Sequence, residues 1–176
     1  MIGTLGDAVP SVASDAWIAP GAVIIGAVRI ASLSSVWYGS VLRADEDQIL
    51  VAAECNIQDL CCIHTDPGQP AVLERRVTIG HHATVHGAHV ETGALIGIGA
   101  VVLGGARIGA RAIVAAGTVV LQDTTVPAGV LYAGVPGRVI RDLTGDDYER
   151  FEGIPDRYVR RAARHRAVQW ESESRS

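Results

Sequence analysis

Aliphatic residues recur at every sixth position along most of this chain, with a one-residue contraction before Val90. The aliphatic column comprises Ile18, Ile24, Ile30, Val36, Leu42, Val51, Ile57, Ile63, Ile79, Val85, Val90, Ile96, Val102, Ile108, Val114, Val120 and Val126. A second column, four residues later in each repeat, is almost always small: Ala22, Val28, Ser34, Ser40, Cys55, Cys61, Ala83, Ala94, Ala100, Ala106, Ala112, Thr118 and Thr124. Self-similarity of this length is the signature of a repeat architecture.

A strict period of six fits neither a helix, which needs about 3.6 residues, nor an ordinary half-buried strand, which needs about 2. It predicts a short strand, a corner and a short strand, with three repeats closing one triangular coil of a mainly β, parallel β-helix. Glycines such as Gly21, Gly80 and Gly117 suit a backbone that turns every few residues. Residues 43–50 and 65–76 break the register, and we expect both to leave the prism as loops.

The repeat stops after Val139, and a polar, amphipathic segment follows. Thr144 is a plausible N-cap with acidic residues after it, and Pro155 divides this segment from a second, arginine-rich stretch. We expect residues 1–140 to form the β-helix, residues 141–170 a C-terminal helical segment packing on the prism, and residues 171–176 a disordered tail. His165, among arginines, is expected to be solvated.

Composition narrows the class of protein. The 176 residues are 48% apolar and only 5% aromatic, which fits one domain with a thin, repetitive core. A net charge of −4 offers no basic surface for nucleic acid, and no apolar stretch is long enough to span a membrane. The N-terminus has no signal-peptide pattern, so a cytoplasmic location is expected. The three cysteines lack ligand spacing, and Cys55 and Cys61 fall in the small core column as inert thiols.

Five of the six histidines fall between residues 64 and 89. His64 follows Ile63 and His86 follows Val85, so both should point out of the prism, and they can stack one coil apart. His81 comes two residues after Ile79, on the side of the prism that precedes the side of His86. It cannot easily join the other two histidines within one chain, although a neighbouring subunit could supply it. Three imidazoles and a water form a tetrahedral site with one open position, which is typical of catalytic zinc.

The segments VWYGSVLRADEDQI, NIQDLCCIHTD, TIGHHATVHG and LYAGVPGRVIRDL resemble the γ-class carbonic anhydrase family of hexapeptide-repeat proteins. The resemblance covers about residues 15 to 143, and it implies that the β-helix is left-handed. It further implies a homotrimer that interconverts CO2 and bicarbonate, with metal sites between subunits: His64 and His86 from one chain and His81 from the next. The implied metal is Zn2+, with Fe2+ or Co2+ as alternatives.

The resemblance also implies roles for the residues around the metal. Gln58 would hydrogen-bond the nucleophile, with Asn56 as a second contact in the same motif. Arg43 and Asp45 match a pair that joins adjacent subunits and orients bicarbonate, and Asp59 would support that network. Tyr132, in the LYAGVPG turn, is a further candidate to face the site.

One departure from the family pattern keeps other functions open. A long acidic loop that carries a proton-shuttling glutamate is replaced here by TDPGQPAVLERR, in which Glu74 is badly placed for that role. Glu46 and Asp47 are the local acids that could substitute. A coenzyme A-dependent acyltransferase, in which a histidine serves as general base, is one alternative. A metal-binding accessory protein with little or no hydration activity is another.

Overall fold

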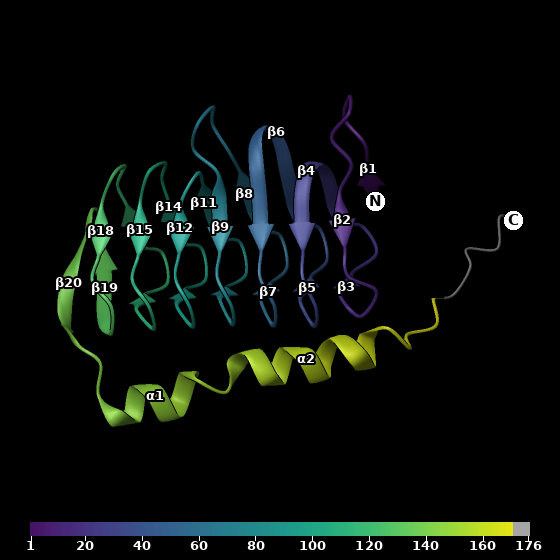
Figure 1. Cartoon of the computed structure of the whole chain (residues 1–176). Coiled ribbons are helices and arrows are strands. Elements are labelled where there is room, and N and C mark those ends of the chain that lie inside the picture. The colour runs from purple at the N-terminus through teal and green to yellow at the C-terminus, as the bar shows by residue number, and fades with distance from the viewer. Residues whose placement is uncertain (171–176) are drawn as a thin grey trace, which may run out of the picture.

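The structure is a computed structural model that describes residues 1–170, so the tail expected at residues 171–176 lies outside it. The described strands form the three walls of a left-handed parallel β-helix, which confirms the predicted fold (Figure 1). The first wall is the 8-stranded sheet of β3 (Trp17–Ile18), β5 (Ser35–Val36), β7 (Asn56–Ile57), β10 (Thr78–Ile79), β13 (Leu95–Ile96), β16 (Ile113–Val114), β19 (Val130–Gly134) and β20 (Gly137–Asp142).

The 12-stranded sheet forms the other two walls. The second wall contains β1 (Ile2–Gly3), β8 (Cys62–His64), β11 (Thr84–His86), β14 (Val101–Val102) and β17 (Val119–Val120). The third wall contains β2 (Ser11–Val12), β9 (Ala71–Leu73), β12 (His89–Val90), β15 (Arg107–Ile108) and β18 (Thr125–Val126). Two longer strands, β4 (Val23–Ile30) and β6 (Val41–Val51), pass from the second wall into the third.

The two repeating columns of the sequence fill the interior of the prism. Ile57, Ile79, Ile96 and Val114 lie in register on consecutive coils of the first wall, and all four are fully buried. Burying such a side chain contributes about 1.5–3 kcal/mol relative to leaving it exposed. Because every coil repeats the same contacts, the core is a column of aliphatic side chains, which explains why so few aromatic residues suffice.

Ser34 and Ser40, two polar members of the small column, are paired with the backbone of the next coil. The Ser40 hydroxyl donates to the Gln58 carbonyl at 2.6 Å and accepts from the Cys61 backbone N–H at 3.1 Å. Burial raises the pKa of the Cys55 and Cys61 thiols to about 12, so both stay protonated and unreactive at neutral pH.

The prediction that residues 43–50 leave the prism as a loop is wrong, because this segment belongs to β6. In the pairing of β4 with β6, Gly26 lies opposite Ala44 and Val28 opposite Ile49, so residues 45–48 face only Ala27. The extra residues bulge at the corner of the prism, and this bulge conceals the period of six. Gly26 permits the close approach, since a Cβ there would lie 2.1 Å from the Ala44 carbonyl oxygen.

The second expected loop is shorter than residues 65–76, because β9 already returns to the third wall at Ala71. The chain leaves the wall only in a tight turn at residues 66–69, where the Gln69 N–H donates to the Asp66 carbonyl at 2.9 Å.

Two helices follow the last coil. β20 ends at Asp142, so the strand crosses the expected boundary at residue 140. α1 (Gly145–Phe151) begins with Thr144 as N-cap, as predicted, and Asp147 completes a capping box. α2 (Ile154–His165) begins just before Pro155, which lies in its first turn. α2 runs along the first wall, where Tyr158 and Ala162 pack with Trp17 and Trp37 (Figure 1). None of the described helices has the length and apolar character that crossing a membrane requires.

The expectation that His165 is solvated is also wrong. Its Nδ1 lies 2.8 Å from the Tyr38 hydroxyl, and its ring centroid lies 4.8 Å from that of Trp37 and 5.7 Å from that of Trp17. The arginines around His165 suggested an exposed helix face, but the last turn of α2 places this side chain against an aromatic corner of the first wall.

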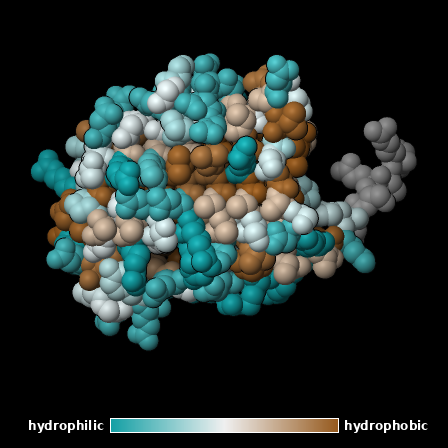
Figure 2. Space-filling model, in the orientation of Figure 1, coloured by the Kyte–Doolittle hydropathy of each residue, from teal (hydrophilic) through white to brown (hydrophobic). Residues whose placement is uncertain are grey.

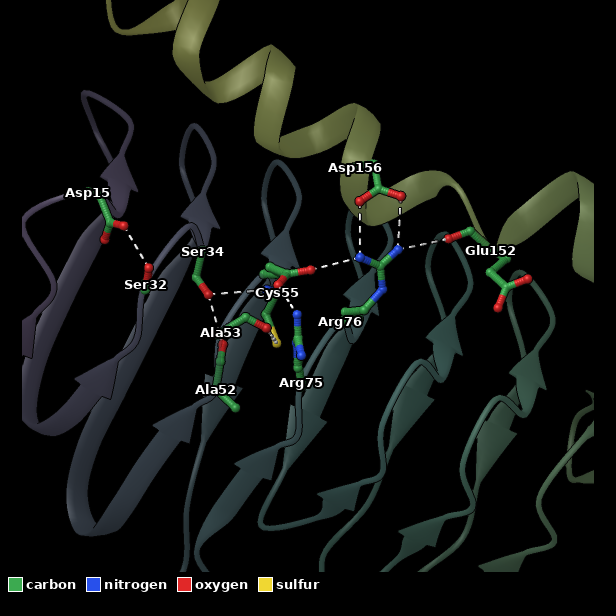
Figure 3. A network of polar contacts seen from close by, with 11 residues as sticks. Asp15, Ser32, Ser34, Ala52, Ala53, Cys55, Arg75, Arg76, Glu152 and Asp156 are labelled. Carbon is green, nitrogen blue, oxygen red and sulfur yellow. Dashed lines mark hydrogen bonds and ion pairs between the residues drawn. The ribbon is translucent and has the colours of Figure 1, made fainter.

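An ion-pair network fastens the start of α2 to the prism (Figure 3). Arg76 contacts Glu54 at 2.7 Å and Asp156 at 2.9 Å, and Arg75 also pairs with Glu54. Hydrogen bonds from Arg75 and Arg76 hold the pKa of Glu54 below its ordinary value. The bond from Arg76 likewise lowers the pKa of Asp156.

Apolar residues gather on the third wall, over β4, β6 and β9 (Figure 2). Leu50 and Val72 line a shallow hollow there, with Arg29 and Glu74 at its margin. Two of the histidines expected to bind metal, His64 and His86, lie away from this hollow, at the ends of β8 and β11 where the second wall turns toward the third.

Candidate metal centre

His64 and His86 end consecutive strands of the second wall. The register pairs Arg43 on β6 with His64 on β8, and His64 with His86 on β11. Because Ile63 and Val85 point into the core, the next residue on each strand points outward. The two imidazole centroids are 4.9 Å apart, with one ring edge facing the other. The spacing in the sequence therefore predicted their proximity.

Two carboxylates face these imidazoles. Asp45 Oδ1 lies 2.9 Å from His64 Nε2, and Asp66 Oδ2 lies 2.9 Å from His86 Nε2. The donor atoms of His64, Asp66 and His86 all lie within 4.8 Å of one another. Sequence reasoning missed Asp66, although its place two residues after His64, at the start of a Pro-Gly turn, was a usable signal.

His86 Nε2 is buried and has no hydrogen-bond partner. Its 2.9 Å contact with Asp66 is short enough for an ion pair, but the two groups are not aligned as donor and acceptor. A buried polar atom without a partner needs an explanation, and an imidazole nitrogen lone pair is a common metal ligand. The residues at this corner therefore fit a divalent cation.

His81 lies elsewhere in the same chain. It follows β10 in the first wall, at the corner where the chain turns toward the second wall, and its Nδ1 lies 2.8 Å from Asp59 Oδ2. Among the described residues, the cluster of possible metal donors does not include His81. The carboxylate of Asp59 can orient this imidazole, which is half exposed and available to another chain.

Arg43 and Asp45 form an ion pair beside His64. Burial raises the pKa of Asp45, but hydrogen bonds from His64 and Arg43 outweigh that effect and hold the pKa below its ordinary value. The side chain is therefore an anion at neutral pH. The Asp45 carboxylate thus links the Arg43 guanidinium group to His64.

Gln58 and Asn56 belong to a buried polar ladder on the first wall. Gln58 Nε2 donates to Asn56 Oδ1 at 3.0 Å, and Asn56 Nδ2 donates to Thr78 Oγ1 at 2.9 Å. Gln58 also lines a mainly apolar cleft of about 480 Å³ between the first wall and the two helices. Leu95 and Phe151 line the same cleft. This ladder fixes the amide of Gln58 and leaves its carbonyl oxygen free to accept a hydrogen bond.

Tyr132 is not near the histidines of its own chain. It lies on β19, separated from β10 by two strands, and its side chain is buried in the aliphatic core. Within one chain the structure therefore gathers His64, His86, Arg43 and Asp45, and leaves His81, Gln58 and Tyr132 apart from them.

No protein-family model matches the chain, but several curated proteins that resemble it are named carbonic anhydrases. A Methanocaldococcus jannaschii protein named "Probable carbonic anhydrase" is 46% identical over 143 residues, which are 81% of this chain and 90% of that protein. A Geobacillus kaustophilus "Carbonic anhydrase" is 36% identical over 94% of this chain and 91% of its own length.

"Gamma carbonic anhydrase 1, mitochondrial" of Arabidopsis thaliana is 37% identical over 92% of this chain. The aligned region is only 61% of that plant protein, so the chain spans about three fifths of its length.

Solved structures agree on the fold. A Bacillus cereus protein described as a presumed acetyltransferase is 36% identical, with a TM-score of 0.94 and coverage of 96% of this chain and 98% of that one. A hexapeptide transferase family protein from Anaplasma phagocytophilum is 33% identical, with a TM-score of 0.89 and coverage of 92% and 96%.

Proposed function

The chain belongs to the γ-class carbonic anhydrase family, and from that premise we propose that it interconverts CO2 and bicarbonate at a metal centre shared between chains. The observation that carries the proposal is the pair His64 and His86, stacked in register with one buried, unpartnered imidazole nitrogen. A cation held by imidazoles supplies a Lewis acid that makes water nucleophilic near neutral pH. The donor set accepts Zn2+, and also Fe2+ or Co2+.

A homotrimer supplies the third imidazole in this proposal. His81 lies at a different corner from His64 and His86, so one chain cannot present all three together. In a ring of identical subunits, one corner of each chain meets a different corner of the next, because the interfaces are heterologous. His81 of one chain can thus join His64 and His86 of its neighbour.

The remaining residues position the reactants. The ladder from Thr78 through Asn56 holds Gln58, whose free carbonyl oxygen would accept a hydrogen bond from the nucleophile and orient its lone pair toward CO2. Arg43, fixed by Asp45, would attract bicarbonate and steady the interface. Asp59 would hold the imidazole of His81. Tyr132 stays a candidate only for contacts across the assembly.

In this scheme, side chains on the bulge of β6 carry the proton away from the site. Glu74 is engaged elsewhere, because its carboxylate pairs with His89 at 2.7 Å and accepts from the Thr92 N–H and hydroxyl. Glu46 is exposed and Asp47 is half-buried, and both lie on the bulge that also carries Asp45. These two carboxylates are our candidates to pass protons to solvent.

Acyl transfer is the second candidate function. The two solved structures carry transferase names, and the cleft beside Gln58 is apolar enough for an acyl group. Calorimetry with coenzyme A on metal-free protein tests it. Binding without metal would favour acyl transfer over CO2 hydration.

The decisive experiment is stopped-flow CO2 hydration on protein loaded with zinc or, anaerobically, with ferrous iron, together with a metal count per chain. Activity that disappears with a chelator and in His64→Ala supports the proposal. His89→Ala is the matched control, since His89 lies on the third wall and pairs with Glu74. Bound metal with no hydration above buffer would reject carbonic anhydrase activity and leave the metal-binding accessory protein.

A further inference from the structure

Asp66 faces the same imidazole nitrogen that lacks a hydrogen-bond partner. Its Oδ2 lies 2.9 Å from His86 Nε2, and its donor atom lies within 4.8 Å of those of both His64 and His86. A carboxylate that merely orients a metal-bound histidine accepts from the ring nitrogen opposite the metal. Asp66 instead approaches the ring at the buried Nε2, where it can share a cation with that nitrogen.

The position of Asp66 is fixed by its backbone. Residues 66–69 form a tight turn closed by the bond from the Gln69 N–H to the Asp66 carbonyl, with Pro67 second and Gly68 third at a φ of 74°. Pro followed by a glycine with positive φ is the sequence that a type II turn requires. The side chain of Asp66 is therefore presented from a rigid turn.

Glycines on the following coils let this turn fold back over the corner. A Cβ at Gly87 would lie 3.0 Å from the Gln69 backbone oxygen, and a Cβ at Gly104 would lie 2.4 Å from the Gln69 Oε1 atom. Because both positions lack a side chain, the turn packs closely against the coils that carry and follow His86. The short connection that replaces a long acidic loop thus holds a carboxylate against the histidine pair.

We propose that Asp66 is a metal donor and that His64, Asp66 and His86 of a single chain bind a divalent transition-metal cation without His81. Two imidazoles and one carboxylate form a donor set that binds Zn2+ or Fe2+ and leaves coordination positions open. The proposal rests on the metal site proposed above, but not on its reaction. His81 of a neighbouring chain then completes a site that already holds its cation.

Co2+ binding tests this directly, because the visible absorption of bound Co2+ reports its coordination. Metal-free wild type, His81→Ala, Asp66→Asn and the double variant are titrated with Co2+, and metal per chain is counted after gel filtration. We expect His81→Ala to retain Co2+ with weakened affinity, and Asp66→Asn in that background to weaken binding by a further factor of about ten or more. Glu74→Gln is the matched control, since Glu74 also pairs with a histidine but lies outside the cluster.

Three results would overturn the inference. Loss of all Co2+ in a folded His81→Ala variant would show that all three histidines are required, and the proposed function would stand. An unchanged affinity and spectrum for Asp66→Asn in the wild-type background would show that Asp66 is not a donor, which can be measured even if His81→Ala does not fold. A wild type that binds no Co2+, Zn2+ or Fe2+ would remove both this inference and the proposed metal centre.

Discussion

His165 and Tyr38 are joined by a hydrogen bond of 2.8 Å across 127 positions of sequence, between the last turn of α2 and a corner of the first wall. Trp17 and Trp37 surround the same imidazole. The C-terminal helix is therefore fastened at both ends, by this aromatic contact and by Arg76 at its start.

Replacing Tyr38 with Phe should lower stability by about 1 kcal/mol, the usual net contribution of one hydrogen bond. The aromatic packing is retained, so the loss reports the hydroxyl alone. Urea unfolding followed by tryptophan fluorescence measures it, because Trp17 and Trp37 lie beside the bond. Tyr148→Phe on α1 is the control and should be close to neutral. Equal losses in the two variants would argue against a specific role for the Tyr38 hydroxyl.

In the proposed trimer, a mixture of two inactive variants should recover activity that neither parent has. His81→Ala and His86→Ala damage different corners, so a trimer that contains both variants has one intact site out of three, and an equal, random mixture should recover about a quarter of wild-type hydration. The two variants are unfolded together, refolded and assayed by stopped flow. A mixture as inactive as its parents would contradict a metal centre shared between chains.

Acid should weaken the attachment of α2 through Glu54. Hydrogen bonds from Arg75 and Arg76 lower its folded-state pKa below the ordinary value of 4.5. The stabilisation is therefore fully present above the unfolded-state pKa and is lost as the pH falls through the folded-state value. The stability difference between wild type and Glu54→Gln should stay constant above the ordinary pKa of 4.5 and then shrink as the pH falls below it. Urea midpoints across this range measure it, and a difference that grows in acid would contradict the assignment.

Gly97→Ala should destabilise the prism by about 1–3 kcal/mol, as overpacking does. A Cβ at Gly97 would lie 2.5 Å from the Ala116 backbone nitrogen, and a backbone atom cannot move aside as a side chain can. Gly145→Ala is the comparison, since a Cβ there meets nothing within 4 Å and Gly145 begins a helix. Thermal unfolding should show a lower midpoint for the first variant and an equal or higher one for the second.

The sequence predicted the parts of this molecule that follow from its period. Ile63 and Val85 fixed the direction of the next side chain, and the repeat fixed its coil, so the proximity of His64 and His86 could be read in advance. The helix start at Thr144 was visible because its capping box is local.

Features that depend on departures from the period could not be read in the same way. The bulge of β6 hid a strand, because four residues face one across the ladder. Asp66 was missed because alternation of side chains ends where the chain enters a turn. His165 was misjudged because its neighbours in sequence are charged, whereas its neighbours in space belong to the first wall.

The stacking of His64 on His86 has a consequence for how this protein can vary. Adjacent strands of any β-sheet lie about 4.8 Å apart, and the two imidazole centroids lie 4.9 Å apart, so the separation is inherited from backbone hydrogen bonding. Whole coils added or removed beyond β11 would leave that separation unchanged. The number of coils and the geometry of the histidine pair are thus independent properties of this fold.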